Sequence, residues 1–549
     1  MNHSPSHDRC HSGRLSRAVR SLLAAPLLCG CLAADAAGPA TRPAVIPTKE
    51  QVGAHALPAG EIAPVTAPFP MPAFKRPTFP DLTIDITARG AKPDGSKATA
   101  PIQAAIDEAN RRGGGTVVVP KGKWLTGRIS LKSNVNLRVD EGAELVFSGD
   151  VADYQPAVFT RNEGVEVMSL GACVYANGQD NIALTGRGKL IGPDKKGSVL
   201  KQVMNADVVE KFIDANQPVA DRVFEGMSGG YVFLPMFVSP INCTNVYIEG
   251  VSLENTAFWN VVPVYCDGVV IRGITVNSVG IPRGDGIDVE SSRNVLIEYC
   301  TLATGDDCFT IKAGRGEDGL RVGKPTENVV VRHCLAQQGH GGITCGSETA
   351  GVIRNLYVSD TVFENVVAGI RFKTRRPRAG GGENLTYERV RMNLTGPAFD
   401  WDMLGSRQFV GELADRLPAR PVGRLTPFYR NIVARDFVVE GATRFIKVVG
   451  IPESPLTDVR IENIDVTSKQ LITATDVVGL TVRNATVRSD APAVTLTDAR
   501  GVSFENVRWT LPDGGAPEVT VAGGQSGDIR FENCAPEKPK NWPATEWGK

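Results

Sequence analysis

A seven-residue pattern recurs along most of this chain, and it restricts the possible folds more than any other feature. A small polar residue comes first, and apolar residues follow at the second, fourth and seventh positions, as in Asn245–Val251. The pattern starts again at Gly268, Asn294, Asn328, Asn355, Asn384, Asn431, Asp458, Gly479, Gly501 and Asp528. A period mostly in the twenties, carried by β-branched residues, is typical of a solenoid whose coils stack to share one core.

The spacing inside the pattern describes one coil. Positions 2 and 4 follow the period of two that a strand requires, and so do position 7 and the usually apolar position 9. The step from 4 to 7 is odd, so the chain must bend there to keep both pairs inside. Asn, Asp or Gly at position 1 suits a tight corner, because these residues tolerate left-handed backbone angles. The sequence therefore predicts an all-β fold, a right-handed parallel β-helix.

Stretches that lack the pattern mark the boundaries of this domain. Residues 38–80 contain ten prolines and form an extended linker or a strap along the body, and residues 81–549 form the β-helix. Ile102–Ala109 has helical apolar spacing, so we expect an N-terminal helix that caps the open end of the core. Two insertions, 200–228 and 403–426, interrupt the period and should leave the stack as loops.

The first 37 residues have the features of an export signal. Four arginines precede the apolar run 21–28, and small residues follow as far as Ala37. The run is far shorter than the ~20 residues that span a bilayer, and no other apolar stretch is long enough. Leu28–Cys31 also resembles a lipoprotein box, with Cys31 as the acylated residue. We therefore expect a periplasmic or extracellular protein, either free or anchored by lipid at Cys31.

Composition excludes several classes of partner. The chain has 60 basic and 60 acidic residues and no basic stripe, so we expect no nucleic-acid partner. The eight cysteines beyond the first 37 residues include no C-x-x-C pair, so we expect no metal and no cofactor. Cys300 and Cys334 share position 7 on adjacent coils, where they form either a buried ladder of small apolar side chains or a disulfide.

A second column of residues in the middle coils carries candidate catalytic groups. The coils align when one inward residue of each is placed in register: Ile287, Phe309, Ile343, Ile370 and Phe399. Two positions earlier stand Asp285 and Asp307, and one place earlier again stand Asp306 and His340. Because stacked coils are ~4.8 Å apart, three carboxylates and an imidazole converge. They cannot all be ionised, so one carboxyl should hold a proton near neutral pH, as glycoside hydrolysis requires.

Two cations stand beside this cluster. Arg371 and Lys373 face outward two coils beyond Asp307, and such cations suit a substrate that carries carboxylates. Each group also has a simpler interpretation. The acids could be a calcium site or a set of solvated turn aspartates, and the cations could belong to a solvated basic patch, since more arginines follow at once.

These residues resemble the motifs of glycoside hydrolase family 28, the polygalacturonases, and the resemblance runs from about residue 81 to the end. The four motifs fall in chain order at Gly284–Asp288, Gly305–Cys308, Gly339–Gly341 and Arg371–Lys373. The resemblance implies an inverting hydrolase of α-1,4-galacturonosyl bonds in pectin, in which Asp306 protonates the glycosidic oxygen while Asp285 and Asp307 activate the attacking water. His340 would tune the acid, and Arg371 with Lys373 would bind the galacturonate carboxylate.

One departure and several alternatives accompany this resemblance. Where the family has Asn, this chain has Arg283, which we count among the substrate-binding residues. A rhamnogalacturonan hydrolase of the same family is an alternative, and so is a pectate lyase in which calcium sits on the Asp cluster and Arg371 acts as base. A non-catalytic carbohydrate-binding solenoid would trimerise, whereas we expect an exported monomer. The two insertions predict walls at the ends of the groove, and hence cleavage from a chain end.

Overall fold

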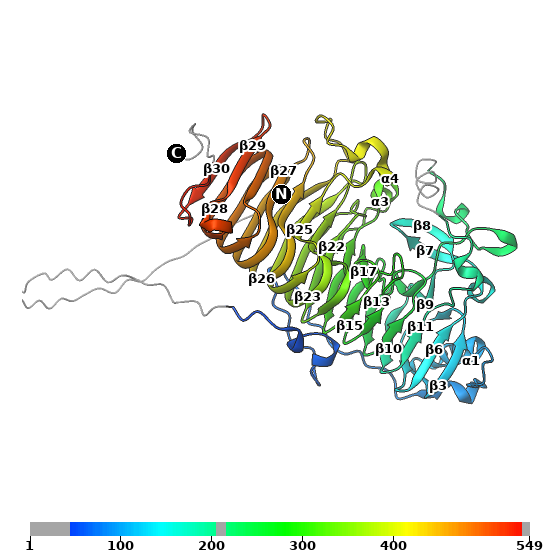
Figure 1. Cartoon of the computed structure of the whole chain (residues 1–549). Coiled ribbons are helices and arrows are strands. Elements are labelled where there is room, and N and C mark those ends of the chain that lie inside the picture. Colours follow the sequence, from blue (N-terminus) through cyan, green and yellow to red (C-terminus); the bar gives the residue numbers. More distant parts are fainter. Residues whose placement is uncertain (1–43, 205–215, 541–549) are drawn as a thin grey trace, which may run out of the picture. The chain divides into compact units, whose positions relative to one another are not determined.

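The structure is a computed structural model that describes residues 44–204 and 216–540, and it is a right-handed parallel β-helix (Figure 1). Coils follow one another in sequence order from the end that carries α1 (Thr99–Arg111) to the end that carries β30 (Gly527–Glu532). The seven-residue pattern predicts this architecture, and the strand pairing confirms it.

The strands fall into groups along the stack. The first coils contain β1 (Thr83–Asp85), β2 (Gly115–Val119), β3 (Gly122–Thr126), β5 (Val135–Val139), β6 (Ala143–Phe147), β10 (Asp180–Gly186) and β11 (Lys189–Ile191). The middle coils contain β13 (Thr244–Glu249), β14 (Ser252–Glu254), β15 (Asp267–Arg272), β16 (Thr275–Asn277), β17 (Ile287–Glu290), β18 (Arg293–Glu298), β19 (Thr301–Ala303), β20 (Phe309–Lys312), β21 (Thr326–Arg332) and β22 (Leu335–Cys345).

In the later coils the strands continue around the bends. These strands are β23 (Ile353–Lys373), β24 (Gly381–Leu394), β25 (Pro397–Asp402), β26 (Phe428–Val449), β27 (Leu456–Ser489), β28 (Ala493–Thr510), β29 (Glu518–Ala522) and β30. A separate parallel sheet joins β4 (Ile129–Ser130), β9 (Ala172–Asn177) and β12 (Met236–Ile241). An antiparallel hairpin joins β7 (Val158–Asn162) to β8 (Val165–Ser169).

Register and corners follow the pattern. Position 2 of successive coils is in register, as in Val246, Val269, Val295, Val329 and Leu356. The asparagines at position 1 adopt positive φ, with Asn328 at 56° and Asn355 at 57°. Their side chains form a ladder in which the amide of Asn355 donates to the Asn328 carbonyl at 3.0 Å. The side chain at each corner therefore makes a hydrogen bond to the corner of the neighbouring coil, and these bonds help to fix the spacing of the coils.

The core runs the length of the stack between the sheets. The inward-facing residues of the stacked strands are almost fully buried. Aromatic rings also stack between coils: the ring centroid of Phe372 is 5.0 Å from that of Trp401 and 4.7 Å from that of Tyr429. All eight cysteines of the described chain are buried and free. The Cys300 backbone N–H donates to the Cys334 Sγ at 3.4 Å, so these residues stack, as unbridged core side chains.

α1 closes the first coil. Its apolar face (Ile102, Ala105, Ile106 and Ala109) is buried and packs against strands of the first coils, including β1, β2 and β5. Such a helix covers the edge that a solenoid otherwise leaves open. The predicted N-terminal cap is present at this position.

Residues 44–80 lie as a strap along the outside of the coils, in blue in Figure 1. Apolar side chains of this segment pack on an outward-facing row of strand residues: Ala183, Tyr247, Val270, Leu296, Val330 and Tyr357. The Arg332 guanidinium donates to the carbonyls of Ala63 at 2.7 Å and Pro64 at 3.0 Å. Arg391 donates to the Pro47 carbonyl at 3.0 Å. The strap therefore covers apolar strand residues that would otherwise face water.

The two insertions leave the stack and meet at a third segment. Arg222 of the first insertion pairs with Asp318 of α3 (Gly316–Val322) at 2.9 Å. Arg424 of the second pairs with Glu317, the neighbouring residue of α3, at 2.5 Å. The second insertion also contains the short helix α4 (Arg407–Val410). α3 therefore links the two insertions on one side of the solenoid.

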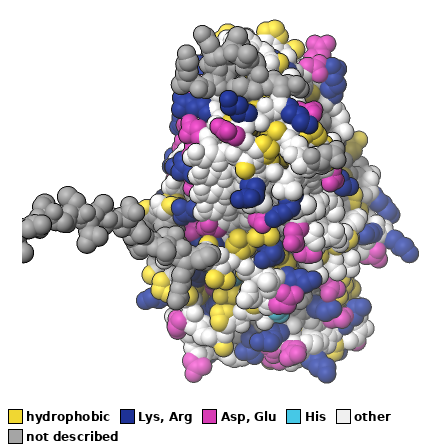
Figure 2. Space-filling model, turned by 60° about the vertical axis from the view of Figure 1, so that its left-hand side comes forward, with side chains coloured by type: hydrophobic (Ala, Val, Ile, Leu, Met, Phe, Trp, Pro, Cys, Tyr) yellow, Lys and Arg dark blue, Asp and Glu magenta, His cyan; other side chains and the backbone are white. Residues whose placement is uncertain are grey.

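The distribution of surface charge and the length of the helices bear on two kinds of partner, nucleic acid and membrane. Figure 2 shows acidic and basic side chains interspersed over one face of the molecule, without a continuous basic stripe. Among the helices in the described part of the chain, none has both the length and the apolar character to cross a bilayer. The export signal expected over residues 1–37, including Cys31, lies outside the described residues.

Candidate active site

The candidate site lies where the middle coils turn into β17, β20, β22, β23 and β25. The inward residues predicted to align do so: Ile287 pairs with Phe309, Phe309 with Ile343, Ile343 with Ile370, and Ile370 with Phe399. This register is confirmed, and it places the residues that precede each inward residue side by side on the outer surface.

The four acid and imidazole groups come together. Carboxylate oxygens of Asp306 and Asp307 and a ring nitrogen of His340 all lie within 4.8 Å of one another. The His340 Nδ1 is 3.7 Å from the Asp306 Oδ1. Asp306 is held by the backbone N–H groups of two other residues: its carbonyl accepts from the His340 N–H at 2.9 Å, and its Oδ1 accepts from the Asp307 N–H at 3.0 Å. Asp285 lines the same cavity.

Exposure separates the three carboxylates. The Asp306 side chain is 30% exposed, whereas Asp285 is 3% exposed and Asp307 is fully buried. Asp306 is therefore the carboxyl that a bound molecule reaches most directly, and the other two lie beneath it.

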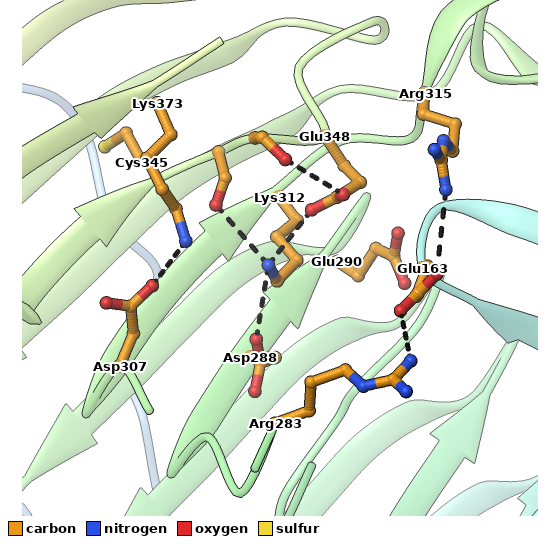
Figure 3. Close-up of polar contacts among 12 residues, drawn as sticks. Glu163, Arg283, Asp288, Glu290, Asp307, Lys312, Arg315, Cys345, Glu348 and Lys373 are labelled. Atoms are coloured by element: carbon orange, nitrogen blue, oxygen red, sulfur yellow. Dashed lines mark hydrogen bonds and ion pairs between the residues drawn. The ribbon is translucent and has the colours of Figure 1, made fainter. Parts of the chain in front are cut away.

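Asp307 is held ionised by two cations. Its Oδ1 accepts from the Arg371 Nη1 at 3.1 Å, and its Oδ2 accepts from the Lys373 Nζ at 2.6 Å (Figure 3 shows the lysine contact). Burial alone would raise the pKa of Asp307, but the charges of Lys373 and Arg371 outweigh it and hold that pKa well below its usual range. Arg371 and Lys373 are 23% and 26% exposed and line the cavity, so they contact Asp307 and remain accessible from it.

Asp285 has the opposite electrostatic environment. Burial raises the pKa of this carboxyl well above its usual range, and the nearby Asp288 and Asp306 raise it further. The sequence predicts that one carboxyl of the cluster holds a proton near neutral pH, and the surroundings of Asp285 favour that state. The surroundings of the two carboxyls therefore favour different charge states, with Asp285 held neutral and Asp307 held ionised.

Arg283 lies at the rim of this cavity. It adopts a φ of 55°, which non-glycine residues seldom do. Its Nη1 contacts Glu163 at the turn of the β7–β8 hairpin at 2.7 Å, and its guanidinium lies 5.6 Å from the centre of the Phe258 ring. The Nη1 of Arg315 is 3.7 Å from the same glutamate, as Figure 3 shows. These contacts connect the coil that carries Asp285 to the hairpin.

The cavity that these groups line has a volume of about 490 Å³, within the size range of pockets that hold small ligands. Its walls come from outside the regular stack. Glu163 belongs to the hairpin turn, Arg315 immediately precedes α3, and Ser406 and Phe409 belong to the second insertion. Segments outside the regular stack thus contribute to the lining of the cavity beside the outward residues of the coils.

Several charged residues of the site are missing from the sequence-based set. Asp288, Lys312 and Glu348 are buried next to the predicted acids, and Glu163 and Arg315 stand in the wall. A signal for Lys312 exists in the register, because it occupies the same column as Lys373 two coils away, with Gly346 between them. Glu163, in contrast, lies on a hairpin outside the repeat.

A parallel β-helix whose walled cavity holds this acid–base cluster and its cations defines a carbohydrate-cleaving enzyme of the β-helical glycoside hydrolase class. Residues 230–396 match the model of the glycosyl hydrolases family 28. The chain is 29% identical to a probable polygalacturonase of Vitis vinifera over 70% of this chain and 74% of that protein. It is 28% identical to an exo-poly-alpha-D-galacturonosidase of Dickeya chrysanthemi over 67% of this chain and 64% of that protein.

A solved structure extends these similarities. The exopolygalacturonase of Thermotoga maritima is 30% identical to this chain and superposes with a TM-score of 0.68, over 75% of this chain and 93% of that one. The chain belongs to glycoside hydrolase family 28.

Proposed function

We propose that this protein is an inverting polygalacturonase that hydrolyses α-1,4-galacturonosyl bonds of pectic chains from one chain end. The observation that carries the proposal is the cavity lined by Asp285, Asp306, Arg371 and Lys373, whose two cations also contact the buried Asp307 carboxylate. It combines groups for acid–base hydrolysis with cations that suit a carboxylate on the substrate. Similar proteins are named polygalacturonases and exopolygalacturonases, which supports the same substrate class.

The roles of the carboxylates follow from their exposure and charge. Asp306, the most exposed, is placed to donate a proton to the glycosidic oxygen as the bond to the anomeric carbon breaks, with His340 3.7 Å away to tune it. Asp307, kept ionised by its cations, accepts a proton from the water that attacks that carbon. Asp285 binds the same water from the neighbouring coil.

The cations bind the substrate. Arg371 and Lys373 are accessible from the cavity while they contact Asp307, so a galacturonate carboxylate shares them with this aspartate. Arg283 adds a third cation at the rim, held by Glu163. A galacturonate carboxylate adds a charged acceptor for the accessible N–H groups of these cations and a neutral sugar does not, which favours substrates with a carboxylate at the cleavage position.

The two alternatives are a calcium-dependent pectate lyase and a rhamnogalacturonan hydrolase, and the lyase differs more in mechanism from the proposed enzyme. Lys373 and Arg371 already neutralise Asp307, which disfavours a divalent cation there. The rhamnogalacturonan hydrolase alternative places a neutral rhamnose on one side of the bond, where two cations have less to bind.

The product formed from polygalacturonate tests the proposal. We expect saturated galacturonic acid or a short oligomer with inverted anomeric configuration, formed equally well after treatment with a chelator. Mass spectrometry and NMR of the fresh product measure this. An unsaturated product absorbing in the ultraviolet, or loss of activity on chelation, would identify a lyase; cleavage confined to rhamnogalacturonan would identify the other hydrolase.

Cleavage from a chain end is the finer part of the proposal. The hairpin turn at Glu163, Arg315 before α3, and Phe409 of the second insertion stand around the cavity, and a walled groove admits a terminus more readily than an internal segment. We expect the viscosity of a polygalacturonate solution to fall slowly while reducing ends accumulate. A sharp early drop in viscosity with few bonds broken would show internal cleavage.

The proposed site of action is outside the cytoplasm, where pectic polymers occur. The leader-like composition of residues 1–37, with Cys31 as the candidate lipid attachment point, supports export.

A further inference from the structure

A largely buried lysine in the lining of the cavity has no part in the roles described so far. Lys312 ends β20 and is 3% exposed. Its Nζ donates to the Glu348 Oε2 at 3.0 Å and to the Gly346 carbonyl at 3.4 Å, and it lies 3.8 Å from the Asp288 Oδ1, as Figure 3 shows. The Nζ also lies 4.4 Å from the centre of the Trp259 ring, which lines the cavity. A lysine ammonium is seldom buried to this extent unless it is paired with acidic groups.

The groups on either side of Lys312 differ. Behind it, Glu348 is also within 3.7 Å of Arg378, so this carboxylate has several cationic neighbours. In front of it, Asp288 is fully buried, and neither of its carboxylate oxygens has a hydrogen-bond partner within the described structure. Within the described structure, the cation that pairs with Asp288 is Lys312. The ammonium is thus held from behind and directed at an otherwise unsatisfied carboxyl.

Asp288 lies next to the candidate catalytic acid–base group Asp285. The two are three residues apart at the start of β17, both are buried, and the Oδ1 of Asp285 also has no hydrogen-bond partner in the described structure. Two buried carboxyls this close favour the neutral form of both unless a cation lies beside them. The charge that Lys312 brings to Asp288 therefore also acts on Asp285.

We propose that Lys312, held by Glu348, is a positioning residue that keeps the Asp285–Asp288 pair at one proton and one negative charge, so that Asp285 can take part in hydrolysis. Without the ammonium the pair takes up a second proton and loses its charge. This inference rests on the proposed function for the identity of the reaction. It adds two residues, Lys312 and Glu348, that act on the catalytic carboxyl through Asp288.

The charges around the pair come from several elements. Asp285 is surrounded by Asp288, Asp306, Lys312 and Asp307, and Asp288 by Lys312, Asp307, Glu290 and Lys373. Lys312 itself is surrounded by Glu348, Asp288, Asp285 and Asp307. Lys373 also acts on Asp288, but it is bonded directly to Asp307. We therefore expect removal of Lys312 to change the protonation of the Asp285–Asp288 pair more than removal of Lys373 does.

Two substitutions should shift the pH dependence in opposite directions. In Lys312→Met the pair retains its second proton to higher pH, so the acid limb of the kcat/KM profile should move up by about one pH unit, a roughly tenfold loss below the limb. In Glu348→Gln the Lys312 ammonium loses this negatively charged neighbour, so its positive charge acts more strongly on the pair. The pair then releases its second proton at lower pH, and the same limb should move down. A structural defect alone would lower activity at all pH values and would leave both limbs in place.

Controls keep the test decisive if a variant folds poorly. Arg272→Met removes another buried cation, paired with Glu298 at 2.9 Å and located on the strand face under the strap, and it should leave the profile unmoved. The double variant Lys312→Gln with Glu348→Gln removes both members of the ion pair, and its acid limb should still move up. Unchanged limbs in folded variants, or shifts in the same direction for both single variants, would overturn the proposal.

A measurement without substrate separates this inference from the proposed function. The infrared carboxyl band of the protonated pair, identified by its change in Asp288→Asn, should persist to higher pH in Lys312→Met than in the unmodified protein. If polygalacturonate is not a substrate but this band shifts, the proposed function fails and the role of Lys312 stands. A band that titrates identically in both proteins would contradict the role of Lys312 whatever the substrate.

Discussion

Replacing Asp306 by asparagine should lower kcat on polygalacturonate by about 10² to 10⁴, the usual contribution of a general acid. The amide cannot donate the proton that the leaving oxygen needs, while its size preserves the hydrogen bond from the Asp307 N–H, which now meets the amide oxygen. Binding should change little, because the cations that bind carboxylates are untouched. Initial rates together with the affinity for an oligogalacturonate, measured by calorimetry, would separate these effects.

Asp465→Asn is a matched control, because this exposed carboxylate pairs with Arg488 far along the chain from the cavity. It should leave kcat unchanged, and both variants should keep the melting temperature of the unmodified protein within a few degrees. An Asp306→Asn enzyme with more than half of the original activity would show that another group donates the proton.

Removing the cations beside Asp307 should produce the second large effect. Lys373→Ala or Arg371→Ala should lower kcat/KM on polygalacturonate by roughly 10- to 100-fold, since a charge-assisted hydrogen bond contributes about 1.5–3 kcal/mol. The loss should include a higher KM, because the substrate carboxylate loses a partner. Each variant should also move the acid limb of the pH profile upward, because the lost cation holds the pKa of Asp307 down and the base is then protonated at higher pH.

Arg488→Ala provides the corresponding control, because it deletes an exposed cation with a single acidic partner. It should change neither KM nor the pH profile. Steady-state kinetics from pH 3 to 8 would test all three proteins. If the Lys373 and Arg371 variants hydrolyse polygalacturonate at the original rate, these cations hold Asp307 in place without binding substrate.

The repeat accounts for how much of the fold could be predicted. Apolar residues at fixed positions require stacked coils, and once Ile287 and Phe309 are aligned, simple counting places Asp285 beside Asp307. The same counting places Arg371 two coils further on. Periodicity is informative here because every coil repeats the geometry of its neighbour.

Counting could not predict which outward residues are buried or how they are paired. Asp288 faces away from the core, yet it is fully buried, with the Lys312 ammonium 3.8 Å from its Oδ1. Arg371 and Lys373 were expected to meet a substrate, and the structure adds their contact with Asp307, which depends on side-chain reach. The ion pairs of Arg222 and Arg424 with α3 join segments that have no period, so no register argument could place them.

The strap has a consequence for the order in which the molecule assembles. Pro47 accepts a hydrogen bond from Arg391, which is 344 residues later in the chain. Coils can form one after another from local contacts, but this contact requires a partner that is made 344 residues later. A chain that emerges amino end first must therefore keep the Pro47 end of the strap undocked until the coil of Arg391 has formed. The part of the strap that packs on Ala183 and Tyr247 can dock earlier, so the strap attaches from its carboxyl end toward its amino end.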